Sequence, residues 1–394
     1  MNIKKIYLKR GKEESLKRFH PWLFSGAIDR MDDGVAEGEA VSVVDGGGQV
    51  VGVGYYQVGT IAVRMLAFEQ REIDVAFFEE KLASALQMRK LIGVADANDN
   101  NVYRLVHGEG DGLPGLVVDI YGETAVVQAH CVGMHHARKM VARALVQVMD
   151  GRVSHVYYKS ETTLPYKADV EAENGFLEGK SFEDVARENG LLFHIDWLKG
   201  QKTGFFVDQR DNRSLLETYA RGKKVLNMFC YTGGFSVYAM RGNAELVHSV
   251  DSSAKAIELT NQNVELNFKG DLRHQAFCED AFRFLEKAGS LYDLIVLDPP
   301  AFAKHRGALH NALKGYIRLN AKAFEKLPKG GILFTFSCSQ VVTKEHFRNA
   351  VFTAAAQAGR VVRILHQLHQ APDHPINIFH PEGEYLKGLV LYVE

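Results

Sequence analysis

The chain has 394 residues, of which 46% are hydrophobic and 24% are charged, and its formal net charge is −1 at pH 7. This length exceeds that of one typical hydrophobic core and indicates two or three domains, while the composition excludes a largely disordered protein. The longest apolar runs, such as residues 294–297, are far shorter than the roughly 20 residues that span a bilayer. We therefore expect no membrane association.

The first residues, MNIKKIYLKRGKEE, are charged where a secretory signal peptide has an apolar stretch, so we expect a cytoplasmic protein. The four cysteines show no C-x-x-C spacing, which argues against a zinc site or a disulfide framework and predicts free thiols. No metal site is expected. The four are Cys131, Cys230, Cys278 and Cys338.

Residues 1–70 are expected to form a small β-barrel, because short β-rich runs alternate with glycine turns between residues 38 and 66. Residues 1–30 contain eight Lys or Arg against three acidic residues. Such a local basic excess can contact phosphate although the whole chain is nearly neutral. The alternative is a solvated face without a partner. For Trp22 we expect packing in the barrel core.

Residues 71–185 are expected to form a central α+β domain. Residues 74–92 have the apolar spacing of an amphipathic helix, with Asp74 as its N-cap. Residues 103–130 predict strands around a loop rich in glycine, and residues 135–149 predict a second helix.

Residues 186–394 alternate strands with amphipathic helices, which predicts a parallel, doubly wound α/β sheet. HPINIFHPEGE is expected as a long connection between the last two strands, and a short closing loop indicates that the last strand runs antiparallel. The expected strands are residues 223–229, 246–251, 274–280, 292–300, 330–338, 361–370 and 385–394.

Polar residues stand at the ends of the expected strands, where α/β sheets bind ligands. The first strand leads into YTGGFS (231–236), whose glycines allow close backbone approach but lack the dinucleotide-binding spacing. Asp251, Asp280 and Asp298 end the next three strands. Asp251 is the expected acceptor for ribose hydroxyls. Each acid could instead cap a helix, but their joint placement favours a ligand site.

These motifs carry a resemblance. NMFCYTGGFSVYA, SVDSS, CEDAF, LDPPAF and TFSCSQ look like the class I S-adenosylmethionine-dependent methyltransferases. Together with HPWLFSGAI, GEGDGLPGLVVDIYG, KTGFFVDQRDNR and PEGEYLKG, they resemble the bacterial 23S ribosomal RNA cytosine-5 methyltransferases that have an N-terminal PUA domain. The resemblance covers essentially the whole chain. It implies a PUA barrel (1–70), a central α+β domain (71–185) and a Rossmann-like methyltransferase domain (186–394).

The resemblance implies an enzyme that transfers a methyl group from S-adenosylmethionine to carbon 5 of a cytosine in large-subunit ribosomal RNA. It makes Cys338 the nucleophile, because a thiolate that adds to carbon 6 activates carbon 5. Asp298 is expected at the edge of the cytosine ring, and the base is expected to be flipped out of its stack. The serines on either side of Cys338 are expected to keep the strand exit hydrated. A homodimer is considered as the assembly.

The expected cofactor-binding residues come from the same strand ends and from the segment FVDQRDNR. For Asp208 and Arg210 the alternative is a helix cap followed by a surface arginine. The full set is Asp208, Arg210, Phe229, Tyr231, Gly233, Gly234, Asp251, Asp280 and Asp298.

Two other functions remain open at this point. The segment DPP followed by Phe302 resembles methyltransferases that act on a base nitrogen, a reaction that needs no thiol. A non-catalytic RNA-binding factor for ribosome assembly is the second alternative. Cys338 distinguishes cytosine-5 methylation from nitrogen methylation. The glycine turn and the three acids argue against the non-catalytic factor, which failure to bind S-adenosylmethionine would favour.

Overall fold

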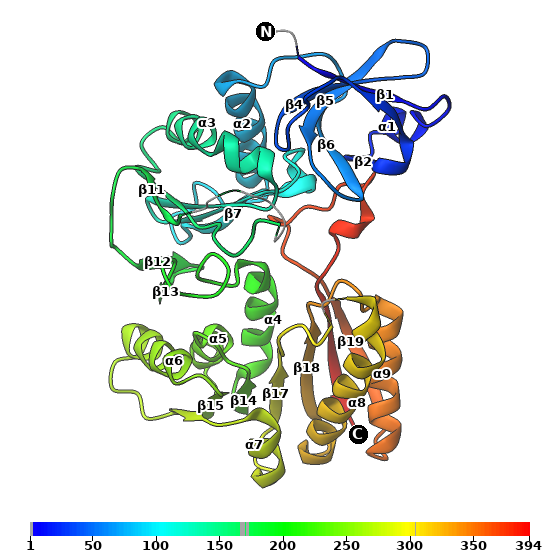
Figure 1. The fold of residues 1–394 in the computed structure, drawn as a ribbon. Coiled ribbons are helices and arrows are strands. Elements are labelled where there is room, and N and C mark those ends of the chain that lie inside the picture. Colours follow the sequence, from blue (N-terminus) through cyan, green and yellow to red (C-terminus); the bar gives the residue numbers. More distant parts are fainter. Residues whose placement is uncertain (1–2, 166–169, 171–172, 304) are drawn as a thin grey trace. The chain divides into compact units, whose positions relative to one another are not determined.

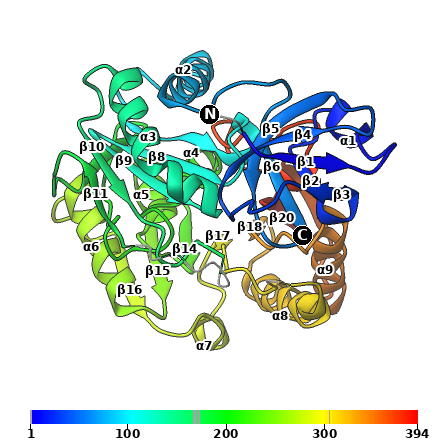
Figure 2. The same ribbon diagram turned by 45° about the horizontal axis from the view of Figure 1, so that its top comes forward.

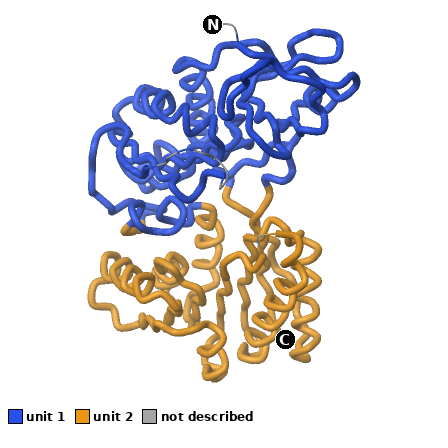
Figure 3. Tube along the Cα trace, viewed as in Figure 1, with its two compact units in different colours: residues 1–190, 195–207, 372–383 blue, residues 191–194, 208–371, 384–394 orange. Residues whose placement is uncertain are grey.

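The computed structural model describes residues 3–165, 170, 173–303 and 305–394. The chain forms two compact units, shown in different colours in Figure 3. The first contains residues 1–190, 195–207 and 372–383, and the second contains residues 191–194, 208–371 and 384–394. Within the described ranges, no helix is both long enough and apolar enough to cross a membrane.

The first sheet of the first unit is the small β-barrel expected from the sequence. Its strand order is β2-β6-β5-β4-β1-β3 (Figure 1). Ile6, Val41 and Val63 point into its core and have no exposed surface. Gly54 has no room for a side chain, because a Cβ there would lie 2.2 Å from the carbonyl oxygen of Arg64. The elements are β1 (Lys5–Leu8), α1 (Glu14–Lys17), β2 (Trp22–Phe24), η1 (Ser25–Ala27), β3 (Ile28–Met31), β4 (Ala40–Val44), β5 (Val50–Tyr56) and β6 (Ile61–Ala67).

Trp22 is not a core residue of the barrel, so that expectation was wrong. Its side chain is only partly buried, and its indole N–H donates to Oε1 of Glu109 at 2.7 Å. The indole ring also lies against the ring of His380, with 4.2 Å between centroids. Trp22 therefore joins β2 to two later segments of the first unit, which no local sequence pattern indicates.

The second sheet of this unit has the strand order β11-β10-β9-β8-β7. Helices α2 and α3 pack on it through apolar residues such as Phe77 and Val141. The predicted cap of α2 is confirmed, because Asp74 accepts a hydrogen bond from the N–H of Phe77 at 2.9 Å. The elements are α2 (Val75–Leu91), β7 (Val102–His107), η2 (Gly108–Asp111), β8 (Leu116–Tyr121), β9 (Thr124–Ala129), α3 (Val132–Met149), β10 (His155–Tyr158), β11 (Gly175–Glu178) and β12 (Val185–Glu188).

A buried ion pair fixes residues 372–383 to the first unit. The side chain of Arg89 is completely buried, and its Nη2 lies 2.8 Å from Oδ2 of Asp111. Nη2 also donates to the main-chain oxygen of Asp373 at 2.7 Å, and the Asp373 carboxylate accepts from the N–H of Arg104 at 3.0 Å. This connection, which includes η5 (Pro381–Gly383), therefore belongs to the first unit although it links two strands of the second.

The second unit has the Rossmann-like α/β fold that the sequence predicts. Its sheet has the order β16-β15-β14-β17-β18-β20-β19, and β20 is antiparallel to both neighbours, as predicted (Figures 1 and 2). The segment that joins β19 to β20 is long, residues 369–386, so the expectation of a short closing loop was wrong. The elements are β13 (Leu191–His194), η3 (Val207–Gln209), α4 (Arg210–Ala220), β14 (Lys224–Met228), α5 (Gly234–Arg241), β15 (Leu246–Asp251), α6 (Ala254–Asn267), β16 (His274–Cys278), α7 (Ala281–Lys287), β17 (Leu294–Leu297), η4 (Arg306–Ala308), α8 (Leu309–Lys326), β18 (Gly331–Ser337), α9 (Lys344–Gln357), β19 (Val362–Leu368) and β20 (Lys387–Val393).

Helices cover both faces of this sheet. Leu333 of β18 belongs to one hydrophobic cluster with residues of α7, α8 and α9. The next residue, Phe334, meets the ring of Tyr219 of α4 with 5.8 Å between centroids. Because successive side chains of a strand point to opposite faces, α4 lies on the face opposite to α7, α8 and α9.

Candidate functional site

The strand order of the second unit reverses between β14 and β17. In α/β sheets, the carboxyl ends of the strands beside such a reversal form the ligand site. Met228 and Leu297, the last residues of these two strands, are direct register partners. The residues that follow them, Phe229 and Asp298, therefore leave the sheet next to each other, and both are site residues expected from the sequence.

The turn after β14 is strained. Phe229 and Tyr231 have φ angles of 59° and 48°, in the left-handed region that side chains with a Cβ rarely adopt. A conformation of this kind costs about 1–3 kcal/mol per residue and persists only where the surroundings impose it. Thr260 of α6 helps to impose it, because its Oγ1 donates to the main-chain oxygen of Tyr231 at 2.9 Å. Gly233 lacks space for a side chain, since a Cβ would lie 2.7 Å from Cγ2 of Thr260.

Asp251, the last residue of β15, closes the other side of this turn. Its Oδ2 accepts a hydrogen bond from the N–H of Tyr231 at 3.0 Å, and its Oδ1 accepts one from the N–H of Ser253 at 2.9 Å. Each carboxylate oxygen has two lone pairs, so both can accept a further hydrogen bond. The carboxylate is thus oriented by the backbone and retains the capacity to receive a diol.

Asp280 and Asp298 lie beyond the strand ends rather than on them. The strand β16 ends at Cys278, and Asp280 caps α7 by accepting from the N–H of Arg283 at 3.0 Å. Asp298 follows the last residue of β17, and its Oδ2 accepts from the side-chain amide of Gln209 at 3.0 Å. The prediction that both acids end strands was wrong by one or two residues, because Asp280 is the N-cap of α7 and Asp298 lies in the loop after β17.

The alternative of a cap and a surface arginine does not hold for the segment before α4. The N-cap of α4 is Gln209, without a side-chain cap hydrogen bond. Asp208 instead accepts from the hydroxyl of Tyr385 at 2.6 Å, and Arg210 is only 2% exposed. Both side chains are therefore buried rather than on the surface.

Cys338 follows the last residue of β18, next to β17 in the sheet, and its side chain is partly exposed. Its Sγ lies 4.0 Å from the main-chain oxygen of Pro299, the residue after Asp298. The sequence places a thiol and a carboxylate on neighbouring strands, and the structure brings their loops into contact.

The two serines beside Cys338 do not hydrate the strand exit, so that prediction was wrong. Ser337 has no exposed surface and donates to the hydroxyl of Tyr316 in α8 at 2.9 Å. Ser339 is 1% exposed, and its Oγ donates to the oxygen of Ala303 at 3.0 Å and accepts from its N–H at 3.1 Å. Both hydroxyls fix the backbone around the thiol from inside the protein.

A buried lysine lies beside Cys338. Lys387 of β20 is the register partner of Ser337 and is 5% exposed. Its ammonium group donates to the main-chain oxygen of Ser339 at 2.6 Å. Burial lowers the pKa of Lys387 to about 8, although the nearby Cys338 and Glu384 oppose the change.

The other cysteines of the described chain are in different environments. Burial raises the pKa of the Cys230 thiol to about 12, and burial also raises the pKa of Cys131. Cys278 is exposed, but it ends β16, which is four strand spacings from β18. At about 4.8 Å per spacing, this is roughly 19 Å across the sheet. Cys338 is therefore the accessible thiol next to the strand reversal.

Sequence reasoning missed three residues of this site. Gln209, Tyr385 and Lys387 contact Asp298, Asp208 and the Cys338 loop, respectively. All three lie in motifs that carry the family resemblance, FVDQRDNR and PEGEYLKG. The motifs therefore indicated which segments belong to the site. They did not indicate the contact that each side chain makes, because that contact depends on which strands are neighbours in the sheet.

A family model described as S-adenosylmethionine-dependent methyltransferase matches residues 105–378, and a PUA-like domain model matches residues 6–68. The chain is 39% identical over 397 residues to the ribosomal RNA large subunit methyltransferase I of Cronobacter sakazakii, with 99% of each chain covered. A protein of the same name from Tolumonas auensis is 40% identical, with 98% of each chain covered. The chain belongs to this methyltransferase family.

Solved structures agree with this methyltransferase in fold. A SAM-dependent candidate methyltransferase from Streptococcus mutans has a TM-score of 0.83 and 23% identity, with 98% of this chain and 99% of that chain covered. SMU.776, a candidate methyltransferase complexed with SAH, has a TM-score of 0.84 and the same identity and coverage.

The residues of the second unit fit the cofactor of the family, S-adenosylmethionine. The Asp251 carboxylate is oriented at a strand end where a ribose diol is bound in related folds. The strained turn at Phe229 and Tyr231 follows β14 directly, and Gly233 lets this turn pack closely against Thr260.

Proposed function

We propose that this methyltransferase modifies carbon 5 of a cytosine in large-subunit ribosomal RNA through a covalent bond between Cys338 and the base. The observation that carries the proposal is the partly exposed Cys338 thiol beside the loop of Asp298 at the strand reversal. Nitrogen methylation gives no reason for a thiol there. The curated relatives bear the name ribosomal RNA large subunit methyltransferase I, which supports the choice of RNA.

In this mechanism the Cys338 thiolate adds to carbon 6 of cytosine, and the electrons of the double bond between carbons 5 and 6 make carbon 5 nucleophilic. Carbon 5 would then take the methyl group, as the bond between that group and the sulfonium sulfur breaks and S-adenosylhomocysteine leaves. Loss of the carbon-5 proton to a base restores the double bond, and the bond between sulfur and carbon 6 breaks. This last step regenerates the free Cys338 thiolate.

Two neighbours of Cys338 assist this chemistry. The Asp298 carboxylate, oriented by Gln209, accepts hydrogen bonds from the amino edge of the cytosine ring. The Lys387 ammonium group stabilises the Cys338 thiolate, since a nearby cation favours the charged form of a thiol. The Lys387 hydrogen bond to Ser339 also fixes the loop that carries the sulfur.

S-adenosylmethionine supplies the electrophilic methyl group when it is bound. Asp251 would hold the ribose hydroxyls, and the backbone of the turn residues would line the cofactor pocket. These residues are Phe229, Tyr231, Gly233 and Gly234. Asp208 and Arg210 support this pocket from the interior, and Asp280 caps the helix α7 at its edge.

We also propose that three successive parts of the chain form separate domains. Residues 1–70 form the PUA domain and contact RNA phosphates through their excess of basic residues. Residues 71–185 form a central domain, and residues 186–394 form the methyltransferase domain.

The test uses Cys338→Ala, with Cys278→Ala as a matched control that removes another accessible thiol. We expect the Cys338 variant to bind S-adenosylmethionine and RNA normally and to lose methyl transfer, while the control keeps full activity. RNA with 5-fluorocytosine at the target should trap a covalent adduct at Cys338, because fluorine blocks the loss of the carbon-5 substituent. An active Cys338→Ala enzyme would disprove the mechanism.

Methylation of a base nitrogen is the second candidate, favoured by the sequence from Asp298 to Phe302. It predicts that Cys338→Ala remains active and that bisulfite sequencing finds no protected cytosine in the product. A wild-type protein that binds ribosomal RNA but transfers no methyl group would instead indicate an assembly factor.

A further inference from the structure

Helix α8 and the turn before it form a basic segment in a chain of net charge −1. Residues 305–330 contain six Lys or Arg and one acidic residue, Glu325. Five basic residues recur at intervals of four along the sequence. They are His310, Lys314, Arg318, Lys322 and Lys326, and Arg306 precedes them with the same spacing. We call these six residues the α8 row.

With 3.6 residues per turn, residues four apart are offset by roughly 40° around a helix. Lys314, Arg318 and Lys322 therefore share one side of α8, and the row as a whole winds slowly around the helix. At a rise of 1.5 Å per residue, neighbours in the row are roughly 6 Å apart along the axis. This interval is comparable to the separation of successive phosphates in an extended nucleic-acid strand. The regular spacing therefore suits a linear polyanion better than a compact anion.

The first half of the row is open to solvent. Arg306, His310, Lys314 and Arg318 are exposed, and among the described residues none of them has an ion pair with a carboxylate. The Arg318 guanidinium lies over the ring of Phe282 of α7, 4.2 Å from its centroid. Stacking on an aromatic ring fixes a guanidinium while leaving its N–H edges available to phosphate.

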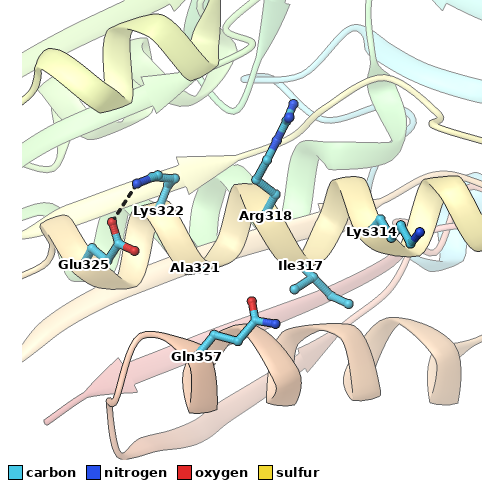
Figure 4. A pocket seen from close by; sticks show the side chains of 7 residues that line it. All are labelled: Lys314, Ile317, Arg318, Ala321, Lys322, Glu325 and Gln357. Atoms are coloured by element: carbon cyan, nitrogen blue, oxygen red, sulfur yellow. Dashed lines mark hydrogen bonds and ion pairs between the residues drawn. The ribbon is translucent and has the colours of Figure 1, made fainter.

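Residues of α8 and Gln357 of α9 line a surface hollow of about 380 Å³, and Figure 4 shows these side chains. Ile317 and Ala321 give it apolar lining, Lys314 and Arg318 lie along it, and Gln357 of α9 points toward α8. Lys322 pairs with Glu325 at 3.0 Å on this side. An apolar surface bordered by cations matches a nucleotide, which combines a ribose and base with a phosphate.

The opposite side of α8 is attached to the thiol loop. Tyr316 is completely buried and binds Ser337, the residue before Cys338. Lys314 and Arg318 are each two residues from Tyr316, which in a helix is about half a turn away. Tyr316 thus attaches one side of α8 to the thiol loop, and Lys314 and Arg318 lie on the other side, one helix diameter, about 10 Å, from that loop.

We propose that the α8 row binds the backbone of a single-stranded RNA segment next to the target base. This inference rests on the proposed function, because it takes RNA as the substrate. The row supplies contacts to phosphate, which position the strand without selecting its sequence. It differs from the basic N-terminal segment in that it belongs to the same unit as the thiol and the cofactor residues.

The test compares Lys314→Gln/Arg318→Gln with a matched double variant, Arg221→Gln/Lys269→Gln. The control residues are exposed and precede β14 and β16, at the edge of the sheet opposite the site. Binding of a fluorescein-labelled, single-stranded RNA 12-mer to the full chain is measured by anisotropy between 50 and 200 mM salt. We expect the α8 variant to bind the RNA about tenfold more weakly at low salt. The slope of log K against the logarithm of the salt concentration should be smaller in magnitude by about 1.4, because each of two lost phosphate contacts contributes about 0.7.

The control variant should bind RNA like the wild type, and both variants should bind S-adenosylmethionine normally by calorimetry. Equal RNA affinity and equal salt slope for the two double variants would overturn the proposal. Methyl transfer by the wild type to a ribosomal RNA transcript is measured in parallel. Its absence would refute the proposed function, whereas an active wild type with unaffected α8 variants would refute only the α8 surface.

Discussion

The Lys387→Met substitution removes a charge from the interior of the second unit and keeps an unbranched side chain. Lys387 is 5% exposed, and burial lowers its pKa from 10.5 to about 8. The charged neighbours act in both directions, because Cys338 and Glu384 favour the ammonium form and Lys344 disfavours it. The protein therefore keeps a cation beside its candidate nucleophile at the expense of stability.

The size of this expense follows from the two pKa values. The two pKa values differ by about 2.5, and each pKa unit corresponds to 1.36 kcal/mol, so the buried ammonium lowers the free energy of unfolding by about 3.4 kcal/mol. Between pH 10.5 and pH 8 the unfolded chain binds the proton and the folded chain does not, so the free energy of unfolding falls as the pH falls. Below pH 8 the full penalty is present. The methionine variant escapes it but loses a charge-assisted hydrogen bond to Ser339, which is worth about 1.5–3 kcal/mol.

We expect Lys387→Met to be more stable than the wild type by roughly 0.5–2 kcal/mol at pH 7. From pH 7 to pH 10 the wild type should gain about 2.5 kcal/mol relative to the variant. Urea unfolding followed by circular dichroism measures both values. The two tryptophans, Trp22 and Trp197, lie in the first unit, so their fluorescence provides an internal control. Lys329→Met, at an exposed position, controls for the substitution itself.

The same variant tests the electrostatic role of Lys387. Iodoacetamide should alkylate Cys338 more slowly in Lys387→Met at pH 7, and Lys387→Arg should restore part of the rate because it keeps the positive charge. If the wild type and Lys387→Met show the same dependence of stability on pH, the lysine is not the buried titrating group. Unchanged alkylation of Cys338 would remove Lys387 from the activation of the thiol.

Three further outcomes are expected. Asp251→Ala should weaken S-adenosylmethionine binding by about 1.5–3 kcal/mol in calorimetry, because it removes a charged acceptor at the strand end; unchanged affinity would exclude this residue from the pocket. Native protein treated with iodoacetamide should be labelled at Cys278 but not at the buried Cys230, as read by peptide mass spectrometry. Asp111→Ala should destabilise the first unit by about 3–5 kcal/mol in urea unfolding, because Arg89 would keep its buried charge without the carboxylate. A loss below 1 kcal/mol would contradict this estimate.

The sequence was sufficient for the features that depend on neighbouring residues. The cap of α2 at Asp74 and the strand ending at Asp251 were predicted because each follows from a local run of apolar spacing and a polar stop. The antiparallel direction of β20 was predicted, although the closing loop on which that prediction rested is long in the structure. The order of strands and helices after residue 223 determined the α/β class, and the motifs at the strand ends indicated the family.

The tertiary structure alone decided which side chains share an environment. Ser337 and Ser339 have the composition of a hydrated strand exit, yet α8 and the loop at Ala303 cover them. Lys387 looks like a surface lysine in the sequence, but β20 lies between β18 and β19, and this position buries it next to Cys338. Burial and partners depend on which distant strands pair, and the free energy of that pairing comes from the whole core rather than from local residues.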